Sequence, residues 1–313
     1  YDTNPLKDNM FKIKPDTMVT ITVKMHGTSE IVGNLLVKKP IVGLGVEINR
    51  KRALKRYKSA LKMPTRYYWQ RKAKKNRLNR ISEDVKGPYK LVYGNVTSSR
   101  NKIKNQYIDP DQSKSYYSSD VHSMFGELVY PLLSPGMTIY GEICGYIPGT
   151  NTGVQVKPKV FDYGCEPGHG FIMPYRITET DENGNKKEWE VCDVYNWTVE
   201  QMKKEWVKDW LRPITILYHG TLSNLYPDID ITQHWNENVL LAMMNDKEHF
   251  GMEMNEPLCK NKLPREGIVL RIDNDPRAEA WKLKCQEFKI KVDDKNFTEG
   301  NVDSESAEAY GEN

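Results

Sequence analysis

Short runs of β-branched and aromatic residues, bounded by Gly, Pro, Asn or Asp, recur along most of the chain and predict β-strands. The first two runs, residues 19–23 and 31–37, flank a loop that contains Gly27, which predicts a β-loop-β unit. Six further strands are expected at residues 91–96, 137–143, 171–177, 189–191, 267–272 and 280–285. Together with several helical segments, this pattern predicts an α+β fold with mostly antiparallel sheets and flanking helices.

Longer segments carry helical signals. Residues 50–80 have a helical composition that is interrupted at Pro64, because proline removes a backbone donor and clashes with the preceding turn. Thr198, followed three residues later by Gln201, resembles a capping box and predicts a helix from there through Trp210. A further helix is expected over residues 232–250, whereas residues 146–170 are rich in Gly and Pro and are expected to be loop.

Charge is distributed unevenly along the chain. The 313 residues carry 46 Lys and Arg against 42 Asp and Glu, a net charge of +4. Residues 50–80 hold fourteen of the basic residues and no acidic ones, so that 32 basic residues face 42 acidic ones elsewhere, a net charge of −10. Such an asymmetry suggests a surface that binds a polyanion, and the alternative is a solvated basic helix.

Composition argues against several classes of protein. Mean hydropathy is −0.69 and the chain has no long apolar run, so no membrane span is predicted. The five cysteines have no CxxC spacing, which predicts neither a disulfide framework nor a structural zinc site and favours a reducing, cytoplasmic location. After Val292 the tail carries seven Asp and Glu against one Lys, a composition typical of disorder.

Candidate chemistry lies in and at the ends of the predicted strands. Lys24 follows the first strand in the segment Lys-Met-His-Gly-Thr-Ser, and alone it would be an ordinary surface lysine. Lys282 and Lys284 lie two apart in the last strand, so both ammonium groups point to the same face. The candidate residues, in chain order, are Lys24, Ser29, Arg100, Glu142, Tyr175, Glu266, Lys282 and Lys284.

In this order, the segments resemble the signature motifs of the covalent nucleotidyltransferase superfamily of DNA ligases, RNA ligases and capping enzymes. Those signatures are KxDG, an Arg after a second strand, a Glu in GE, an aromatic residue, EGxV and KxK. In the first of them His26 stands where most of the superfamily has Asp, a feature similar to the RNA ligase 2 branch. The resemblance spans roughly residues 19–288 and implies an adenylyltransferase domain.

The chemistry of these residue types agrees with the resemblance. A neutral lysine amine can attack the α-phosphorus of ATP, expel pyrophosphate and form a Lys–AMP phosphoramidate. A free lysine has a pKa of about 10.4, and nearby cations, a bound metal or burial would favour the neutral form. Lys282 and Lys284 could also neutralise the charge that develops on the α-phosphate.

The resemblance implies a role for each of the other candidates. Arg100 and Glu142 would hold the ribose of ATP, and Ser29 would line the nucleotide pocket. Tyr175 would stack on the adenine, a contact that any base can make through its π-face. Glu266 would help to bind a divalent metal, Mg²⁺ or Mn²⁺, because both prefer hard oxygen ligands.

Two features depart from the superfamily pattern. Lys24 and Arg100 are 76 positions apart, which predicts a basic insertion at about residues 40–90. Only 29 residues follow Lys284, fewer than an OB domain or a C-terminal helical domain needs. The expected organisation is therefore an adenylyltransferase domain over residues 1–292 and an acidic, disordered tail over residues 293–313.

The basic insertion is a candidate nucleic-acid-binding segment. Its basic side chains could grip phosphates while Tyr57, Tyr67, Tyr68 and Trp69 stack on bases. The alternative is a solvated pair of helices with the aromatic residues in its core. The candidate phosphate-binding residues are Arg50, Lys51, Arg52, Lys55, Arg56, Arg71, Lys72, Lys74, Lys75 and Arg77.

The sequence therefore predicts an ATP-dependent RNA ligase that joins a 5′-phosphate end to a 3′-OH end, with RNA repair as a biological role implied by the resemblance. An ATP-dependent DNA ligase is the nearest alternative, and a GTP-using capping enzyme is a further one. A catalytically silent nucleic-acid-binding module on the same fold is the alternative from a different class. The intact Lys24, Glu142 and Glu266 argue against that last alternative.

Overall fold

The computed structural model describes residues 3–41, 44–62, 68–86, 89–100, 103, 120–155, 159–275, 277 and 279–293. The predicted acidic tail lies outside these residues from position 294 onward, and so do Pro64 and Tyr67. The side chains of Tyr68 and Trp69 are also outside the description.

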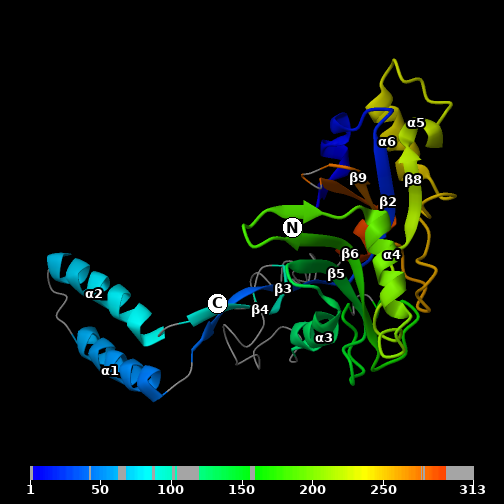
Figure 1. The fold of residues 1–313 in the computed structure, drawn as a ribbon. Coiled ribbons are helices and arrows are strands. Elements are labelled where there is room, and N and C mark those ends of the chain that lie inside the picture. The colour runs from blue at the N-terminus through cyan, green and yellow to red at the C-terminus, as the bar shows by residue number, and fades with distance from the viewer. Residues whose placement is uncertain are drawn as a thin grey trace. The chain divides into compact units, whose positions relative to one another are not determined.

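The chain divides into two compact units, one formed by Tyr1–Asn34 with Asn95–Asn313 and one formed by Leu35–Gly94 (Figure 1). The first unit contains most of the strands. The second contains two long helices, and the predicted insertion at about residues 40–90 falls inside it. The assignment of residues 1–292 as an adenylyltransferase domain remains a prediction.

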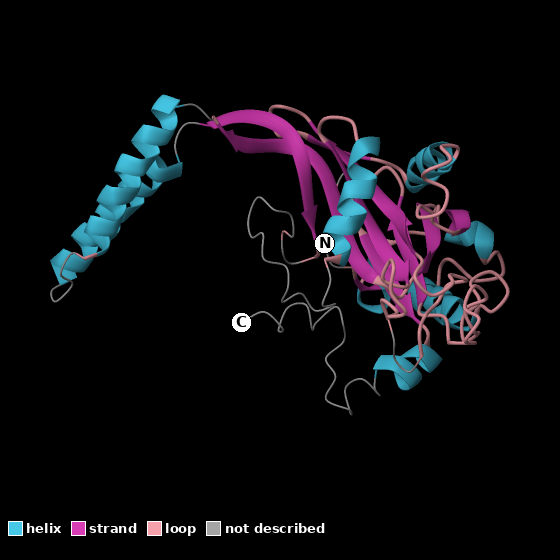
Figure 2. Ribbon diagram, turned by 90° about the horizontal axis from the view of Figure 1, so that it is seen from below, coloured by secondary structure: helices cyan, strands magenta, loops and turns pink. Residues whose placement is uncertain are grey.

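Ten strands form two five-stranded sheets among the described residues (Figure 2). One sheet has the order β1-β10-β9-β2-β8 and the other the order β4-β3-β5-β6-β7. Every pairing whose register is defined is antiparallel except that of β1 with β10. The predicted α+β class with mostly antiparallel sheets is therefore confirmed. The strands are β1 (Asn4–Pro5), β2 (Met18–Lys24), β3 (Thr28–Pro40), β4 (Tyr89–Ser98), β5 (Met137–Gly145), β6 (Gly170–Thr180), β7 (Lys186–Glu188), β8 (Ile216–Thr221), β9 (Gly267–Ile272) and β10 (Ala280–Lys284).

Helices flank these sheets, and short helical turns join several of the strands. The α-helices are α1 (Leu44–Leu61), α2 (Tyr68–Lys86), α3 (Val121–Val129), α4 (Val191–Met202), α5 (Leu222–Leu225), α6 (Trp235–Asn245) and α7 (Gln286–Phe288). The shorter turns are η1 (Leu6–Asp8), η2 (Met10–Lys12), η3 (Tyr130–Leu132) and the π-helical η4 (Lys289–Asp293).

Alternation along the strands of the first sheet separates a core face from a polar face. Side chains two apart in a strand point the same way. The buried side chains of Ile21, Leu270 and Trp281, one each from β2, β9 and β10, belong to the same hydrophobic core. The residues between the core positions in these three strands point to the opposite face. That second face carries the site described below.

A second core lies on the other sheet. It combines Phe125 of α3 and Val194 of α4 with Ile139 and Ile177 of β5 and β6, and all four side chains are fully buried. Two separate cores of this kind allow the two sheets of the first unit to present their remaining faces to a shared pocket.

In the second unit, α1 and α2 lie side by side as a hairpin, as both views show (Figures 1 and 2). Among the described side chains of α1, the buried ones are the small residues Ala53 and Ala60, with Tyr57 half-buried beside them. Among those of α2, Gln70, Lys74 and Leu78 are half-buried, and Lys74 donates a hydrogen bond to the Leu61 carbonyl at 2.6 Å. The described part of the seam between the two helices is therefore partly polar.

Two secondary-structure predictions are misplaced in the region after β6. The predicted strand that returns alongside β6 is β7, and it ends at Glu188, so residues 189–191 lead into α4, which begins at Val191. The predicted capping box does not open a helix, because Thr198 lies inside α4 and its hydroxyl donates to the Val194 carbonyl at 2.8 Å. A threonine hydroxyl can bond the carbonyl four residues earlier, which makes such motifs ambiguous in sequence.

Two negative expectations can be compared with the structure. All five cysteines are free thiols. Within the described ranges, none of the helices is both long and apolar enough to cross a lipid bilayer.

Candidate active site

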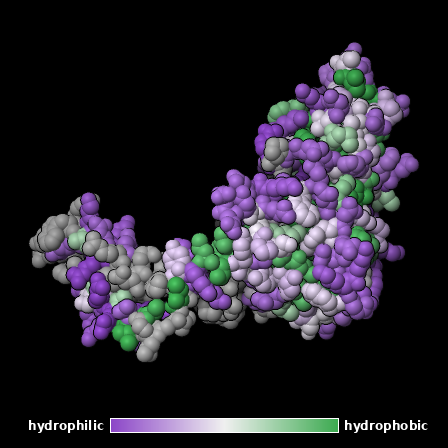
Figure 3. Space-filling view, in the orientation of Figure 1, coloured by the Kyte–Doolittle hydropathy of each residue, from purple (hydrophilic) through white to green (hydrophobic). Residues whose placement is uncertain are grey.

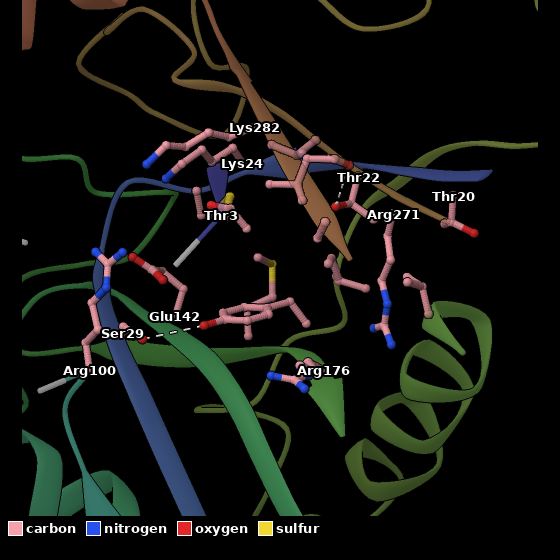
Figure 4. Close-up of a pocket in the computed structure, with 18 residues that line it drawn as sticks. Thr3, Thr20, Thr22, Lys24, Ser29, Arg100, Glu142, Arg176, Arg271 and Lys282 are labelled. Atoms are coloured by element: carbon pink, nitrogen blue, oxygen red, sulfur yellow. Dashed lines mark hydrogen bonds between the residues drawn. The ribbon is translucent and has the colours of Figure 1, made fainter. Parts of the chain in front are cut away.

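A pocket in the first unit is lined from both sheets (Figure 4). The register of the first sheet arranges its contribution in rows, because Lys24 of β2 and Lys284 of β10 both pair with Gly267 of β9. The next row joins Thr22, Val269 and Lys282 in the same way. Lysine ammonium groups from two strands thus gather at one end of this face.

The chain crosses from the first sheet to the second immediately after Lys24. The crossing loop passes so close to β5 that a Cβ on Gly27 would lie 2.2 Å from the Ile143 carbonyl oxygen, which explains the glycine at this position. The Gly27 amide donates to Glu142 Oε1 at 3.1 Å, and Gln155 Nε2 donates to the Gly27 carbonyl at 2.8 Å. These bonds fix Lys24 relative to the second sheet.

Glu266 lies between two lysines at the start of β9. Its Oε1 is 2.8 Å from Lys24 Nζ and 3.3 Å from Lys284 Nζ, and its side chain is 2% exposed. Burial would raise the pKa of Glu266, but the ammonium groups of Lys24 and Lys284 outweigh burial and lower that pKa to about 2. Glu266 is therefore a buried, ionised carboxylate in this structure.

Gly267 makes this arrangement possible. Its φ is +148°, and a Cβ there would lie 2.1 Å from the Leu283 carbonyl oxygen. Only glycine accepts that backbone conformation together with such a close approach of β10. The Glu-Gly pair therefore places the carboxylate and brings the strand of Lys282 and Lys284 beside it.

Lys284 is anchored from two sides. Besides Glu266, its Nζ contacts Asp293 Oδ2 at 3.0 Å. Burial acts to lower the pKa of Lys284, but the carboxylates of Glu266 and Asp293 overcome burial and raise it. Lys284 therefore remains charged near Lys24, whereas Lys282 extends into the pocket and lies beside Lys24 in Figure 4.

The second sheet supplies the other candidates. Ser29 of β3 pairs in register with Glu142 of β5, and both line the pocket together with Arg100 and Tyr175. The Tyr175 hydroxyl lies 3.5 Å from Ser29 Oγ. Burial raises the pKa of Tyr175, with a smaller contribution from Glu142, so the phenol stays protonated. In Figure 4 Arg100, Glu142 and Ser29 lie on the same side of the pocket as the lysines.

Of the eight residues singled out in the sequence, six line the pocket directly. The other two, Glu266 and Lys284, are joined to Lys24 through the ion pairs described above. The roles assigned to these residues remain predictions. The basic residues predicted to bind nucleic acid lie elsewhere, on α1 and α2 of the second unit.

Sequence reasoning missed the opposite end of the pocket. Thr20, Arg176 and Arg271 also line it, and both arginines are more than nine-tenths buried. Glu188 holds them, at 2.5 Å from Arg176 Nε and 3.0 Å from Arg271 Nη2. Thr20 lies on the same face of β2 as Lys24, because alternate side chains of a strand point the same way, so the sequence could have identified Thr20. No local pattern signals that Arg271 contacts the distant Glu188.

Glu266, beside the pocket, and Glu142, which lines it, are the carboxylates closest to a divalent metal here. Among the residues that the structure describes, no group of three His, Cys, Asp or Glu side chains could hold a metal ion. Glu266 Oε2 is nevertheless a buried oxygen without a hydrogen-bond partner in the described part of the chain. This fits a metal that takes one protein carboxylate and completes its shell with phosphate and water oxygens, as Mg²⁺ commonly does.

No protein-family model matches the chain, and a search of curated proteins found no match. Among solved structures, the chain is similar to variants of an RNA ligase of Naegleria gruberi. One, with AMP and Mn, has 12% identity and a TM-score of 0.44, over 94% of this chain and 58% of that one. Another, with ATP and Mn, has 12% identity and a TM-score of 0.43 over the same shares. A third, without ligand, has 12% identity and a TM-score of 0.44, over 94% of this chain and 57% of that one.

This chain thus spans somewhat more than half the length of the solved chains that it matches. Those solved structures are variants of an RNA ligase.

Proposed function

We propose that the protein is an ATP-dependent RNA ligase that works through a covalent Lys24–AMP intermediate. The observation that carries this proposal is the position of Lys24. Its Nζ lies beside a buried carboxylate and in a pocket that also contains Lys282, Arg100 and Glu142. A nucleophilic amine at one end of a pocket lined by cations is the arrangement that attack on a nucleotide phosphate requires.

In the first step, the lone pair of Lys24 Nζ forms a bond to the α-phosphorus of ATP. The bond from that phosphorus to the bridging oxygen of the β-phosphate breaks, and pyrophosphate leaves with the electron pair. The amine must be neutral at attack, so its extra proton has to leave first. Glu266 lies 2.8 Å away but, with a pKa of about 2, is too weak a base to take up that proton, which therefore passes to solvent or to the bound nucleotide.

The cations around Lys24 serve the same step. Lys282 lines the pocket next to Lys24 and can neutralise charge on the α-phosphate oxygens. Tyr175 and Val269 line the pocket from opposite sheets, so a purine between them would contact an aromatic face and an apolar one. Glu266 Oε2 would hold Mg²⁺ or Mn²⁺, which when bound would offset negative charge on the ATP phosphates.

The remaining steps transfer the AMP. An oxygen of a 5′-phosphate end attacks the phosphorus of Lys24–AMP, the N–P bond breaks, and the amine of Lys24 takes up a proton. A 3′-OH then attacks the 5′-phosphate, AMP leaves, and a phosphodiester remains. The substrates of the proposed enzyme are therefore polynucleotide ends, of RNA in our proposal and of DNA in the nearest alternative.

Incubation with ATP radiolabelled in the α-phosphate, in the presence of Mg²⁺ or Mn²⁺, tests the first step. We expect label on the protein after denaturing electrophoresis and none on Lys24→Ala. Lys14→Ala is the matched control, because Lys14 is an exposed lysine outside the pocket, and it should label like the parent. Labelled Lys24→Ala, or no label on the parent with either metal, would contradict the proposal.

The same assay separates the alternatives. Labelling by GTP in place of ATP would favour a capping-type enzyme. Addition of RNA or DNA ends with 5′-phosphate and 3′-OH then shows which polynucleotide is sealed, and we expect RNA. A parent protein that binds RNA but never becomes labelled would support the silent nucleic-acid-binding module.

A further inference from the structure

One face of α1 carries a stripe of lysines. Lys51, Lys55, Lys58 and Lys62 are spaced by four, three and four residues, and all four are exposed. Residues at this spacing lie above one another on one face of a helix. Lys62 follows the last residue of α1 directly, so the stripe reaches the end of the helix.

The stripe lies opposite the seam with α2. Each residue of an α-helix turns about 100° from the one before, so Ala53 and Ala60 lie nearly opposite Lys51 and Lys58. The buried alanines face the partner helix, and the lysines therefore face away from it. None of the four lysines has an ion-pair partner among the described residues.

No acid in this part of the sequence compensates the stripe. Between Glu47 and Glu83 the chain contains no Asp or Glu. Lysines at positions i and i+4 repel each other along a helix. An unbalanced row of cations on one face of a helix favours an anionic partner that neutralises it.

We infer that this lysine stripe is a binding surface for the phosphate backbone of a nucleic acid, and that it binds without selecting a base sequence. Phosphate contacts position a protein on nucleic acid but carry no sequence information. The one described aromatic side chain of the two helices, Tyr57, is half-buried in the seam and is not presented for stacking. The stacking part of the sequence-based hypothesis therefore gains no support from Tyr57.

The surface of the hairpin distinguishes this partner from a lipid bilayer. A helix that lies on a membrane keeps a continuous apolar face for the acyl chains. Among the described side chains of α1, the exposed apolar residues are Ile48, Leu54 and Leu61, and Ile48 lies on a different face from the two leucines. The described surface of the hairpin in Figure 3 is mostly hydrophilic. A nucleic acid, which is a polyanion without acyl chains, fits this surface better than a lipid bilayer does.

If the proposed function holds, the lysine stripe would bind the nucleic-acid substrate of the ligase. The observations behind the stripe come from the hairpin alone, so binding by the stripe and the proposed ligase activity can each fail without the other. The test measures the affinity of the full chain for a short RNA duplex without 5′-phosphates over a series of salt concentrations. The stripe variant changes Lys51, Lys55, Lys58 and Lys62 to Gln, which has a helix propensity close to that of Lys. We expect weaker binding and a slope of log K against log salt that is flatter by up to about 3.6 units, about 0.9 for each lost phosphate contact.

Two matched variants control for charge and for folding. The same four positions changed to Arg keep the charge and should keep the slope. Changing Lys7, Lys14, Lys187 and Lys247, four exposed lysines of the first unit, to Gln removes the same charge elsewhere and should leave the slope within about one unit of the parent. Circular dichroism shows whether each variant keeps its helices.

Self-adenylylation should be unchanged in all of these variants, which separates the hairpin from the proposed active site. Equal slopes for the parent and the stripe variant would overturn the inference. So would binding of the parent to phosphatidylserine vesicles or to polyglutamate without binding to the RNA duplex, because the stripe would then serve another class of partner. Failure of the parent to self-adenylylate would refute the proposed ligase and leave this result intact.

Discussion

At the scale of single residues, Glu266 determines the charge of the candidate active site. Lys24 and Lys284 contact the same carboxylate oxygen, so one negative charge faces two positive ones, and Lys282 adds a third positive charge in the pocket. Asp293 offsets part of this excess from the far side of Lys284. The excess of cations prepares the pocket for an anionic ligand, which agrees with a nucleotide substrate.

Glu266→Gln should both destabilise the protein and abolish self-adenylylation. The change leaves Lys24 and Lys284 without their shared carboxylate, and breaking a buried ion pair costs about 3 kcal/mol or more. Denaturant unfolding measures this loss. Glu279→Gln is the control, because its ion pair with Lys12 is partly exposed and should contribute less than about 1 kcal/mol. Similar losses in the two variants would contradict the central position of Glu266.

The acid stability of the protein should also depend on Glu266. Its pKa is lowered from an ordinary value of 4.5 to about 2 in the folded chain, so protonation favours the unfolded chain. The stabilisation is complete above pH 4.5 and is lost as the pH falls toward about 2. It amounts to about 3 kcal/mol at 1.36 kcal/mol for each pKa unit.

Unfolding midpoints measured across this range for the parent and for Glu266→Gln isolate the contribution. We expect the parent to lose more stability on acidification, because the variant has no carboxylate to protonate at this position. Parallel pH profiles for the two proteins would show that Glu266 is not ionised in the folded chain.

At the scale of elements, the strands that carry the site were predictable because their signals are local. Alternation and β-branched residues identified β2, β9 and β10, and the short motifs at their ends identified Lys24, Glu266 and Lys282. The register that brings Lys24 and Lys284 to either side of Gly267 joins residues more than 240 positions apart, which no local pattern specifies.

The errors of prediction have the same origin. Strand β8 and helix α3 were not predicted, and the ends of α4 were misplaced. The Glu188 carboxylate that joins Arg176 and Arg271 also escaped notice, because its contact with Arg271 spans 83 positions. In these cases tertiary packing decides the structure, and the local signal was ambiguous or weak.

Gly267→Ala tests the junction between the elements of the site. The new Cβ would collide with the Leu283 carbonyl and would have to adopt a φ that L-residues avoid. We expect separation of β9 from β10, a loss of stability above about 2 kcal/mol, and loss of self-adenylylation. Gly184→Ala provides the comparison, since Gly184 has a φ of +85° but nothing within 4 Å of its added Cβ.

The comparison variant measures the cost of the backbone conformation alone, about 1 kcal/mol, and should keep full self-adenylylation. If Gly267→Ala were no more harmful than Gly184→Ala, the close approach of the two strands would not matter for the site.

At the scale of the whole molecule, the two units differ in how they are stabilised. The first has two hydrophobic cores with fully buried aromatic and aliphatic residues such as Phe125, Phe250 and Ile268. In the hairpin of the second unit, the buried residues among the described side chains of α1 are Ala53 and Ala60, and α1 also carries a row of lysines that repel one another. Each like-charged i, i+4 pair costs about 0.2–0.5 kcal/mol on a helix surface.

We therefore expect the hairpin to open separately from the sheets of the first unit. Amide hydrogen exchange should show lower protection in α1 and α2 than in β2 and β9, because the lysines of α1 repel one another whereas β2 and β9 contribute to a buried hydrophobic core. Added monovalent salt should slow exchange in the hairpin by screening the repulsion among Lys51, Lys55, Lys58 and Lys62, and changing these four residues to Gln should slow it as well. Exchange in β2 and β9 should respond to neither change and serves as the internal control. Equal protection of the hairpin and these strands, or faster exchange in the hairpin at higher salt, would contradict the view that charge repulsion limits its stability.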